Sequence, residues 1–211
     1  MKKIGKFFNS LGMGLISCLA IILLLVLFIP VNILFPTKIE GLKNLRKTKK
    51  GAVIACNHFS NFDIIYLSIR LFLFVPKRKF LAKKELNKNC FVGFLIRACG
   101  AIFISRGALD KTAVREVNDA LKSGKKVIVF PEGTRNKTES DDMQEIKSGV
   151  VFFAKRADVP IIPMRFVHRM KIFRKNKICI GEPYLVGENG KLSTAEEVGV
   201  LENKFNELVE V

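Results

Sequence analysis

The sequence predicts an α/β fold in which a mostly parallel central sheet is flanked by helices. Residues 101–105, 110–124 and 126–130 have in turn the patterns of an apolar strand, an amphipathic helix and a second apolar strand, which is the order of a βαβ unit. Residues 51–56 form another short apolar run, and a longer apolar segment follows it. Polar and charged residues come directly after these strands, where open α/β sheets usually place their ligand sites.

The other elements follow from periodicity and from residues that begin and end helices. Asp110 is a candidate N-cap, and Gly124 closes the same helix. The two prolines within residues 159–164 predict that this strand lies at an edge or an irregular end of the sheet. The predicted strands are residues 51–56, 80–82, 101–105, 126–130, 159–164 and 177–180, and the predicted helices are residues 63–72, 91–98, 110–124, 146–157 and a last helix with a capping box at Ser193 and Glu196.

The amino-terminal segment predicts a membrane anchor. Residues 11–29 are almost entirely apolar and are about as long as the hydrocarbon core of a bilayer requires. No small-residue cleavage pattern follows before Pro30, so we expect the segment to be retained rather than removed as a signal peptide. Lysines precede the segment, and lysines and an arginine follow it. By the positive-inside rule, both ends of the segment are therefore expected on the cytoplasmic side. Residues 1–36 are therefore predicted to form a spanning helix or a re-entrant helical hairpin, and residues 37–211 a single folded domain.

The charge of the chain restricts its partners to anionic ones. Lys and Arg number 36 against 19 Asp and Glu, which gives a formal net charge of +17. Nucleic acid, acidic lipid surfaces and phosphorylated substrates all fit this charge. The apolar segment favours membrane lipids, and we expect no nucleic-acid partner.

The cysteines and histidines predict a reduced domain without a metal site. The five cysteines are odd in number and form no CxxC pair, which is typical of core residues in a cytoplasmic domain. His58 and His168 are the only histidines, and neither lies near a cysteine pair, so no zinc site is expected. Cys56 could be a nucleophile, but its place at the end of a buried strand favours a core position.

His58 lies at a predicted junction between a strand and a helix, followed five positions later by Asp63. The two side chains could not face each other within one uniform helix, but they can meet if His58 is on the turn that enters the helix. A carboxylate beside an imidazole is the arrangement that general-base catalysis needs. Ser60 and Asp63 also match a helix-capping box, in which Asp63 would only satisfy a backbone amide. The spacing alone does not decide between these roles.

Two further strand ends carry groups suited to an anion. Arg106 follows residues 101–105, and the glycine after it permits close backbone approach. Residues 130–135 read Phe-Pro-Glu-Gly-Thr-Arg, in which the proline ends the ladder and Gly133 allows a tight turn. Thr134 and Arg135 could then grip a phosphate through a hydroxyl and a guanidinium. Neither glycine-rich nucleotide-binding pattern occurs in the chain, so phosphate recognition would use side chains.

Together these residues resemble the glycerophospholipid acyltransferases, specifically the bacterial 1-acylglycerol-3-phosphate O-acyltransferase branch. Asn57, His58, Ser60 and Asp63 match the family's NHxSxxD block, and residues 130–135 match its FPEGTR block. Residues 100–106 resemble a GxxFIxR block and residues 159–164 a VPIIPV block, with secondary positions at Lys83, Lys147 and Gly149. Ser105 and Asn136 depart from the residues usual at those positions.

The resemblance implies transfer of a fatty acyl group from acyl carrier protein or coenzyme A to the sn-2 hydroxyl of lysophosphatidic acid, which gives phosphatidic acid. In this interpretation His58 is the general base and Asp63 holds it, with no covalent acyl-enzyme, no cofactor and no metal. The implied substrate-binding residues are Arg106, Glu132, Gly133, Thr134, Arg135 and Lys83. Residues 37–211 would then be the catalytic domain, on the cytoplasmic face of a bacterial cell membrane and in contact with its anionic lipids.

Other functions fit parts of the same pattern. The enzyme could acylate a different lysolipid. A basic, membrane-tethered module that binds anionic ligands without chemistry would explain the charge, but not a histidine, carboxylates and arginines at strand ends. A metal-dependent phosphoesterase would need more ligands than the chain offers.

Overall fold

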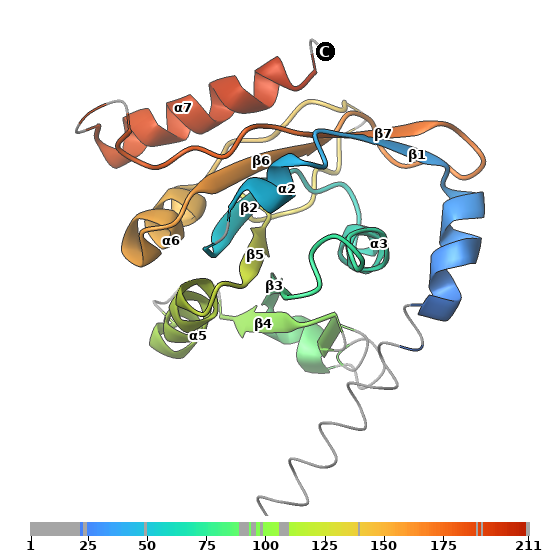
Figure 1. The fold of residues 1–211 in the computed structure, drawn as a ribbon, viewed down its shortest axis with the longest axis horizontal. Helices are drawn as coiled ribbons and strands as arrows, with labels where there is room; N and C mark the ends of the chain where they lie inside the picture. Colours follow the sequence, from blue (N-terminus) through green and yellow to red (C-terminus); the bar gives the residue numbers. More distant parts are fainter. Residues whose placement is uncertain are drawn as a thin grey trace, which may run out of the picture.

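A seven-stranded sheet forms the centre of the protein (Figure 1). The computed structural model describes residues 22, 25–48, 50–88, 93, 96–97, 99–105, 110–138, 140–188, 190 and 192–209. The strand order is β1-β7-β6-β2-β5-β3-β4, and all neighbours are parallel except β6 and β7. The mostly parallel sheet predicted from the sequence is therefore confirmed. The strands are β1 (Thr37–Glu40), β2 (Ala52–Cys56), β3 (Arg78–Lys83), β4 (Ala101–Ile104), β5 (Lys126–Val129), β6 (Ile161–Phe166) and β7 (Asn176–Ile180).

Helices cover both faces of this sheet. Helix α3 (Phe62–Arg70) packs on one face, and α5 (Lys111–Lys122), α6 (Gly149–Ala157) and α7 (Thr194–Glu207) pack on the other. The sequence of β2 explains the two cores, because alternate side chains of a strand point to opposite faces. Ile54 packs in the core with α3, whereas Val53 packs in the core with α5 and α6. All five residues of β2 are buried, as expected for a central strand.

The connections leave the sheet on opposite faces at the neighbouring strands β2 and β5. The chain leaves β2 for α3 on one face, but leaves the neighbouring strand β5 for α6 on the other face. Open α/β sheets bind ligands in the crevice where two adjacent strands send their connections to opposite faces, at the carboxyl ends of those strands. The segments that contain His58 and residues 130–135 lie at this point.

Residues 159–164 were expected at an edge or an irregular end of the sheet, and the first of these alternatives is wrong. Strand β6 lies between β2 and β7, and all six of its residues are buried. The Pro163 carbonyl oxygen accepts a hydrogen bond from the Gly181 amide just beyond β7, 2.8 Å away, and the N–H and C=O sides of a strand residue point the same way. The side of Pro163 that lacks an N–H therefore faces the end of β7 and not the ladder with β2.

Several boundaries and elements differ from the sequence-based expectation. Helix α6 begins three residues later than predicted, and the charged strand β1, the single turn α2 (Asn44–Lys47) and the 3₁₀ turn η1 (Lys84–Lys88) were not predicted. The N-cap at Asp110 and the capping box at Ser193 are confirmed, since each side chain accepts the expected backbone N–H. Most of the helix predicted at residues 91–98 lies outside the described residues.

The amino-terminal segment is described only in part. Residues 25–34 are helical, and Leu27, Phe28 and Val31 pack against the core on the α3 side of the sheet. Within the described part of the chain, no helix has both the length and the hydropathy needed to cross a bilayer. Most of the predicted segment at residues 11–29 lies outside that part.

Candidate active site

Five parallel strands end at one edge of the sheet, and residues at or just after the ends of four of them, β2, β5, β3 and β4, line a pocket of about 340 Å³. The turn after β2 contributes His58, and the segment after β5 contributes Phe130 and residues 133–135. Strand β3 contributes Lys83 and β4 contributes Ile104. Residues from four separate segments therefore converge because their strands are neighbours and point the same way.

The side chains of His58 and Asp63 are in contact, as their spacing in the sequence permits. The His58 Nδ1 atom lies 2.9 Å from the Asp63 Oδ2 atom, and only 12% of the His58 side chain and 3% of the Asp63 side chain are exposed. An ionised carboxylate can only accept a hydrogen bond, so Nδ1 carries the proton and the Nε2 atom is left free to accept one. The imidazole also stacks on the Phe130 ring, with centroids 4.0 Å apart and an interplanar angle of 19°. The ring is thereby fixed in both tautomer and orientation.

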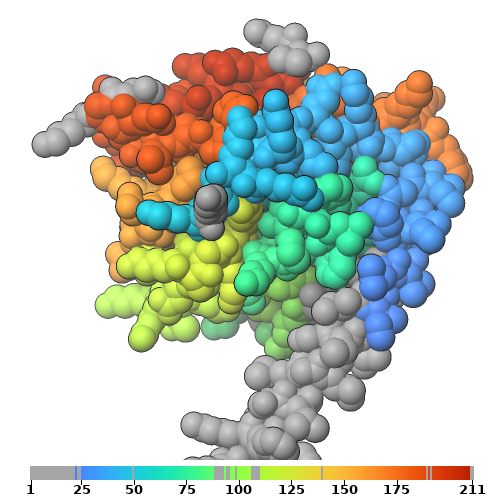
Figure 2. All heavy atoms as spheres, viewed as in Figure 1, coloured from blue at the N-terminus to red at the C-terminus, as the bar shows by residue number. Residues whose placement is uncertain are grey.

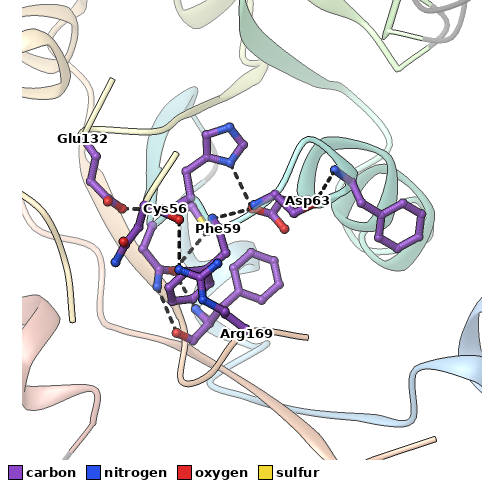
Figure 3. Close-up of polar contacts among 11 residues, drawn as sticks. Cys56, Phe59, Asp63, Glu132 and Arg169 are labelled. Carbon is purple, nitrogen blue, oxygen red and sulfur yellow. Dashed lines mark hydrogen bonds and ion pairs between the residues drawn. The ribbon is translucent and has the colours of Figure 1, made fainter. Parts of the chain in front are cut away.

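The Asp63 carboxylate also has the second role that the sequence left open. Its Oδ2 atom accepts hydrogen bonds from the backbone amides of Phe59 and Ser60, both at 2.8 Å (Figure 3). These amides belong to the turn that enters α3, so Asp63 shapes this turn while it holds His58. The full capping box is not formed, because the amide of Asp63 donates to the Ser60 carbonyl oxygen and not to its hydroxyl. One carboxylate therefore both shapes the turn and holds the imidazole.

The segment after β5 holds the backbone of His58 on both sides. The His58 amide donates to Glu132 Oε1 at 2.9 Å, and its carbonyl oxygen accepts from the Asn136 amide at 2.7 Å. The second Glu132 oxygen accepts from the Gln144 amide at 3.3 Å. Burial raises the pKa of the Glu132 carboxyl, an effect that these two amide donors oppose. Glu132 is only 3% exposed and is turned toward the protein interior.

The pocket itself is cationic and partly apolar. Lys83, Arg135 and Lys137 are its charged lining residues, and none of the described lining residues is acidic. Gly133 has a φ of 66°, in the left-handed region that glycine adopts most readily, and the Lys147 side chain lies across it, 3.2 Å from where a Cβ would be. Apolar side chains complete the lining toward β3 and β4, namely Ile64, Leu81, Ala82, Leu86, Ile104, Val129 and Phe130. An anionic group and an apolar chain could both be accommodated here.

The structure brings most of the predicted site residues together. His58, Lys83, Gly133, Thr134 and Arg135 line the pocket, with Asp63 directly behind His58. Arg106 lies outside the described residues, so its assignment stays a prediction. Glu132 does not line the pocket, and its geometry is that of a positioning residue for His58 rather than of a ligand for substrate.

Sequence reasoning assigned no role to three residues that build the site. Lys137 lines the pocket. Asn57 joins the ends of β2 and β6, since its side chain exchanges two hydrogen bonds with the backbone of Phe166, at 2.8 and 3.0 Å. The Arg169 guanidinium lies 5.0 Å from the Phe59 ring centroid (Figure 3) and donates to the carbonyl oxygens of two residues in the 136–138 segment. No spacing rule predicts these contacts, although an asparagine directly after a buried strand is a usable signal.

The structure supports the core interpretation of Cys56. This residue is fully buried, and burial raises the pKa of its thiol well above the usual range, which keeps it protonated and poorly nucleophilic. Among the described residues, no three His, Cys, Asp or Glu side chains are grouped closely enough to hold a metal ion.

Comparison with known proteins identifies the family of the chain. Residues 36–167 match the acyltransferase family. The chain is 27% identical to the 1-acyl-sn-glycerol-3-phosphate acyltransferase of Bacillus subtilis over 82% of this chain and 85% of that protein. It is 33% identical to the Saccharomyces cerevisiae enzyme of the same name over 60% of this chain, but spans only 41% of that protein.

A solved structure has the same fold. The crystal structure of the 1-acyl-sn-glycerophosphate (LPA) acyltransferase PlsC from Thermotoga maritima matches with a TM-score of 0.61 and 26% identity, covering 82% of this chain and 71% of that one. The family match covers the segments around His58 and residues 130–135, together with most of the sheet. The chain therefore belongs to the acyltransferase family, as its motifs predict.

Proposed function

We propose that the protein transfers a fatty acyl group from a thioester to the sn-2 hydroxyl of lysophosphatidic acid, with phosphatidic acid as the product. The observation that carries this proposal is a cationic, partly apolar pocket that opens onto His58, whose Nδ1 atom is held by Asp63. The names of the relatives support the choice of acceptor.

The proposed reaction uses His58 as a general base. Its Nε2 atom takes the proton of the acceptor hydroxyl as that oxygen attacks the thioester carbonyl carbon. The carbon–sulfur bond then breaks, and the proton passes from the imidazolium to the departing thiolate. Asp63 stabilises the imidazolium between these steps. The buried Cys56 thiol offers no route to a covalent acyl-enzyme.

The cations of the pocket suit the acceptor's phosphate. Arg135, Lys83 and Lys137 can neutralise a phosphomonoester while the apolar lining residues contact the glycerol and acyl portions. We propose acyl carrier protein or coenzyme A as the donor's carrier. We also propose that residues 1–36 attach the protein to the cytoplasmic face of a bacterial cell membrane, where the acceptor is present and the net charge of +17 favours anionic lipids.

A direct assay tests the activity. The purified full chain in detergent is incubated with lysophosphatidic acid and either acyl-acyl carrier protein or acyl-coenzyme A, with and without a chelator, and the lipids are separated by thin-layer chromatography. Phosphatidic acid should form with at least one donor, at a rate that the chelator does not change. Absence of product with both donors would contradict the proposed function.

Arg135 provides the test of acceptor recognition. We expect Arg135→Lys to lower kcat/KM for lysophosphatidic acid about tenfold or more, because a lost charge-assisted contact with phosphate costs about 1.5 to 3 kcal/mol and lysine cannot form the guanidinium fork. A lysolipid without a free phosphate should be affected much less. Arg156→Lys, an exposed site on α6 outside the pocket, is the matched control. Equal losses on both acceptors would place Arg135 in the fold or the donor site instead.

Glu132 provides a test of positioning. Glu132→Ala should lower kcat and the melting temperature together while KM for the acceptor changes little, because the amides of His58 and Gln144 lose their acceptor and each unsatisfied buried donor costs about 1 to 3 kcal/mol. Glu132→Gln keeps one carbonyl oxygen and should restore part of both losses. A raised KM with unchanged kcat and melting temperature would instead indicate that Glu132 contacts substrate.

A further inference from the structure

The loop between β6 and β7 presents apolar side chains to solvent. Ile172 is 57% exposed and Phe173 is 72% exposed. Lys171, Arg174 and Lys175 flank them on either side and are also exposed. The segment therefore has two large apolar side chains at its tip with three cations next to them, and neither Ile172 nor Phe173 belongs to either of the two buried cores.

The backbone conformation of this loop and the hydrogen bonds of Asn176 keep its tip exposed to solvent. Phe173 has a φ of 56°, a left-handed conformation that glycine or asparagine adopts far more readily than phenylalanine. The Asn176 side chain closes the loop, because it accepts from the Lys171 amide at 2.9 Å and donates to the carbonyl oxygens of Lys171 and Arg174 at 3.0 and 2.9 Å. A phenylalanine in this backbone conformation is strained and buries little apolar surface, so it does not stabilise the loop.

The tip lies against the amino-terminal helical segment. The Phe173 amide donates to the Leu34 carbonyl oxygen at 2.7 Å, and the loop lies beside the upper end of this helix in Figure 1 and at the same margin of the molecule in Figure 2. The helical segment is itself apolar on its exposed side, with Leu25 at 49%, Val26 at 65%, Ile29 at 67% and Ile33 at 63% exposure. Monomeric soluble proteins rarely expose so many large apolar side chains in one region.

We propose that the tip of the β6–β7 loop, Ile172 and Phe173, inserts into the lipid interface of a membrane, with Lys171, Arg174 and Lys175 at anionic headgroups. Lipid fits this surface better than a protein partner, because its apolar tip carries cations at the level where lipid phosphates lie. This inference rests on the proposed function, which places the acceptor in a membrane. Arg169, two residues before this loop, contacts the Phe59 ring and the Asn136 carbonyl oxygen beside the pocket. Insertion of the tip would therefore set the distance between the pocket and the bilayer surface.

The absence of tryptophan from the chain allows a direct test. The full-length Phe173→Trp variant is reconstituted in phosphatidylcholine and phosphatidylglycerol vesicles that contain lipid brominated in its acyl chains. We expect a blue-shifted emission that the brominated lipid quenches. Leu185→Trp, at a loop position 48% exposed that follows β7, is the matched control and should be neither shifted nor quenched. Equal, unquenched emission from both variants would overturn the proposal.

Activity separates this inference from the proposed function. Phe173→Asn removes the apolar side chain at a backbone conformation that asparagine tolerates, so we expect normal folding. Its kcat/KM should fall about tenfold on vesicle-borne acceptor, the loss expected when one large apolar side chain no longer enters lipid, and should match the unmodified protein on detergent-dispersed acceptor. Equal activity on vesicles would contradict the role of the tip while leaving the proposed function intact. Failure of the unmodified protein on dispersed acceptor would contradict the proposed function, and the quenching result would still report on the tip.

Discussion

Replacing His58 with alanine is expected to abolish measurable acyl transfer. General-base assistance is worth about 10² to 10⁴ in rate, and this chain holds the imidazole in one tautomer through Asp63 and in one plane through Phe130. Among the described lining residues there is no second histidine and no carboxylate or thiol, so no such group is placed to take the proton in its stead. The measurement is kcat with saturating donor and acceptor, together with the melting temperature to show that the variant is folded.

The second histidine supplies an unusually close control. His168 also pairs with an aspartate, since its Nδ1 atom lies 3.2 Å from Asp141 Oδ2, but its side chain is 66% exposed and does not line the pocket. His168→Ala should keep nearly full activity. If His58→Ala retained activity within tenfold of the unmodified protein, the base would have to be another group, and the proposed mechanism would fail.

Replacing Asp63 with asparagine should lower kcat by about 10² or more while the protein stays folded. The amide cannot stabilise the imidazolium, and one carbonyl oxygen must replace the atom that now serves the imidazole and two backbone amides. A modest fall in stability of about 1 to 3 kcal/mol should accompany this loss, because one or more buried donors lose their acceptor. Steady-state kinetics and thermal unfolding measure the two effects separately.

Asp110 is the control that distinguishes a capping role of Asp63 from a catalytic one. Its carboxylate also accepts two backbone amides at a helix start, from Ala113 at 3.0 Å and Ser105 at 3.1 Å, but it holds no histidine. These hydrogen bonds, chiefly the one from Ala113, lower the pKa of the Asp110 carboxyl. Asp110→Asn should lower the melting temperature with little change in kcat. If both variants lost only stability, Asp63 would be a capping residue and no more.

Neighbouring residues alone determined much of this protein. The strands at residues 51–56, 101–105 and 126–130, and the helix that Asp110 begins, are confirmed to within about two residues, because apolar periodicity and capping are local properties. The contact between His58 and Asp63 could also be predicted, since both belong to one turn between a strand and a helix. The acyltransferase family followed from motifs that lie at these strand ends.

The tertiary structure decided what depends on the order of the strands. Glu132 supports His58 across 74 residues of sequence, and Asn57 joins β2 to β6 across 109, because β2 lies between β5 and β6. Strand β6 is interior and not at an edge because β7 returns antiparallel beside it. The same antiparallel return turns Phe173 out to solvent beside the amino-terminal helix. Periodicity specifies which face of a strand is buried but not which strand lies next to it, so contacts between distant residues appear only once the sheet is assembled.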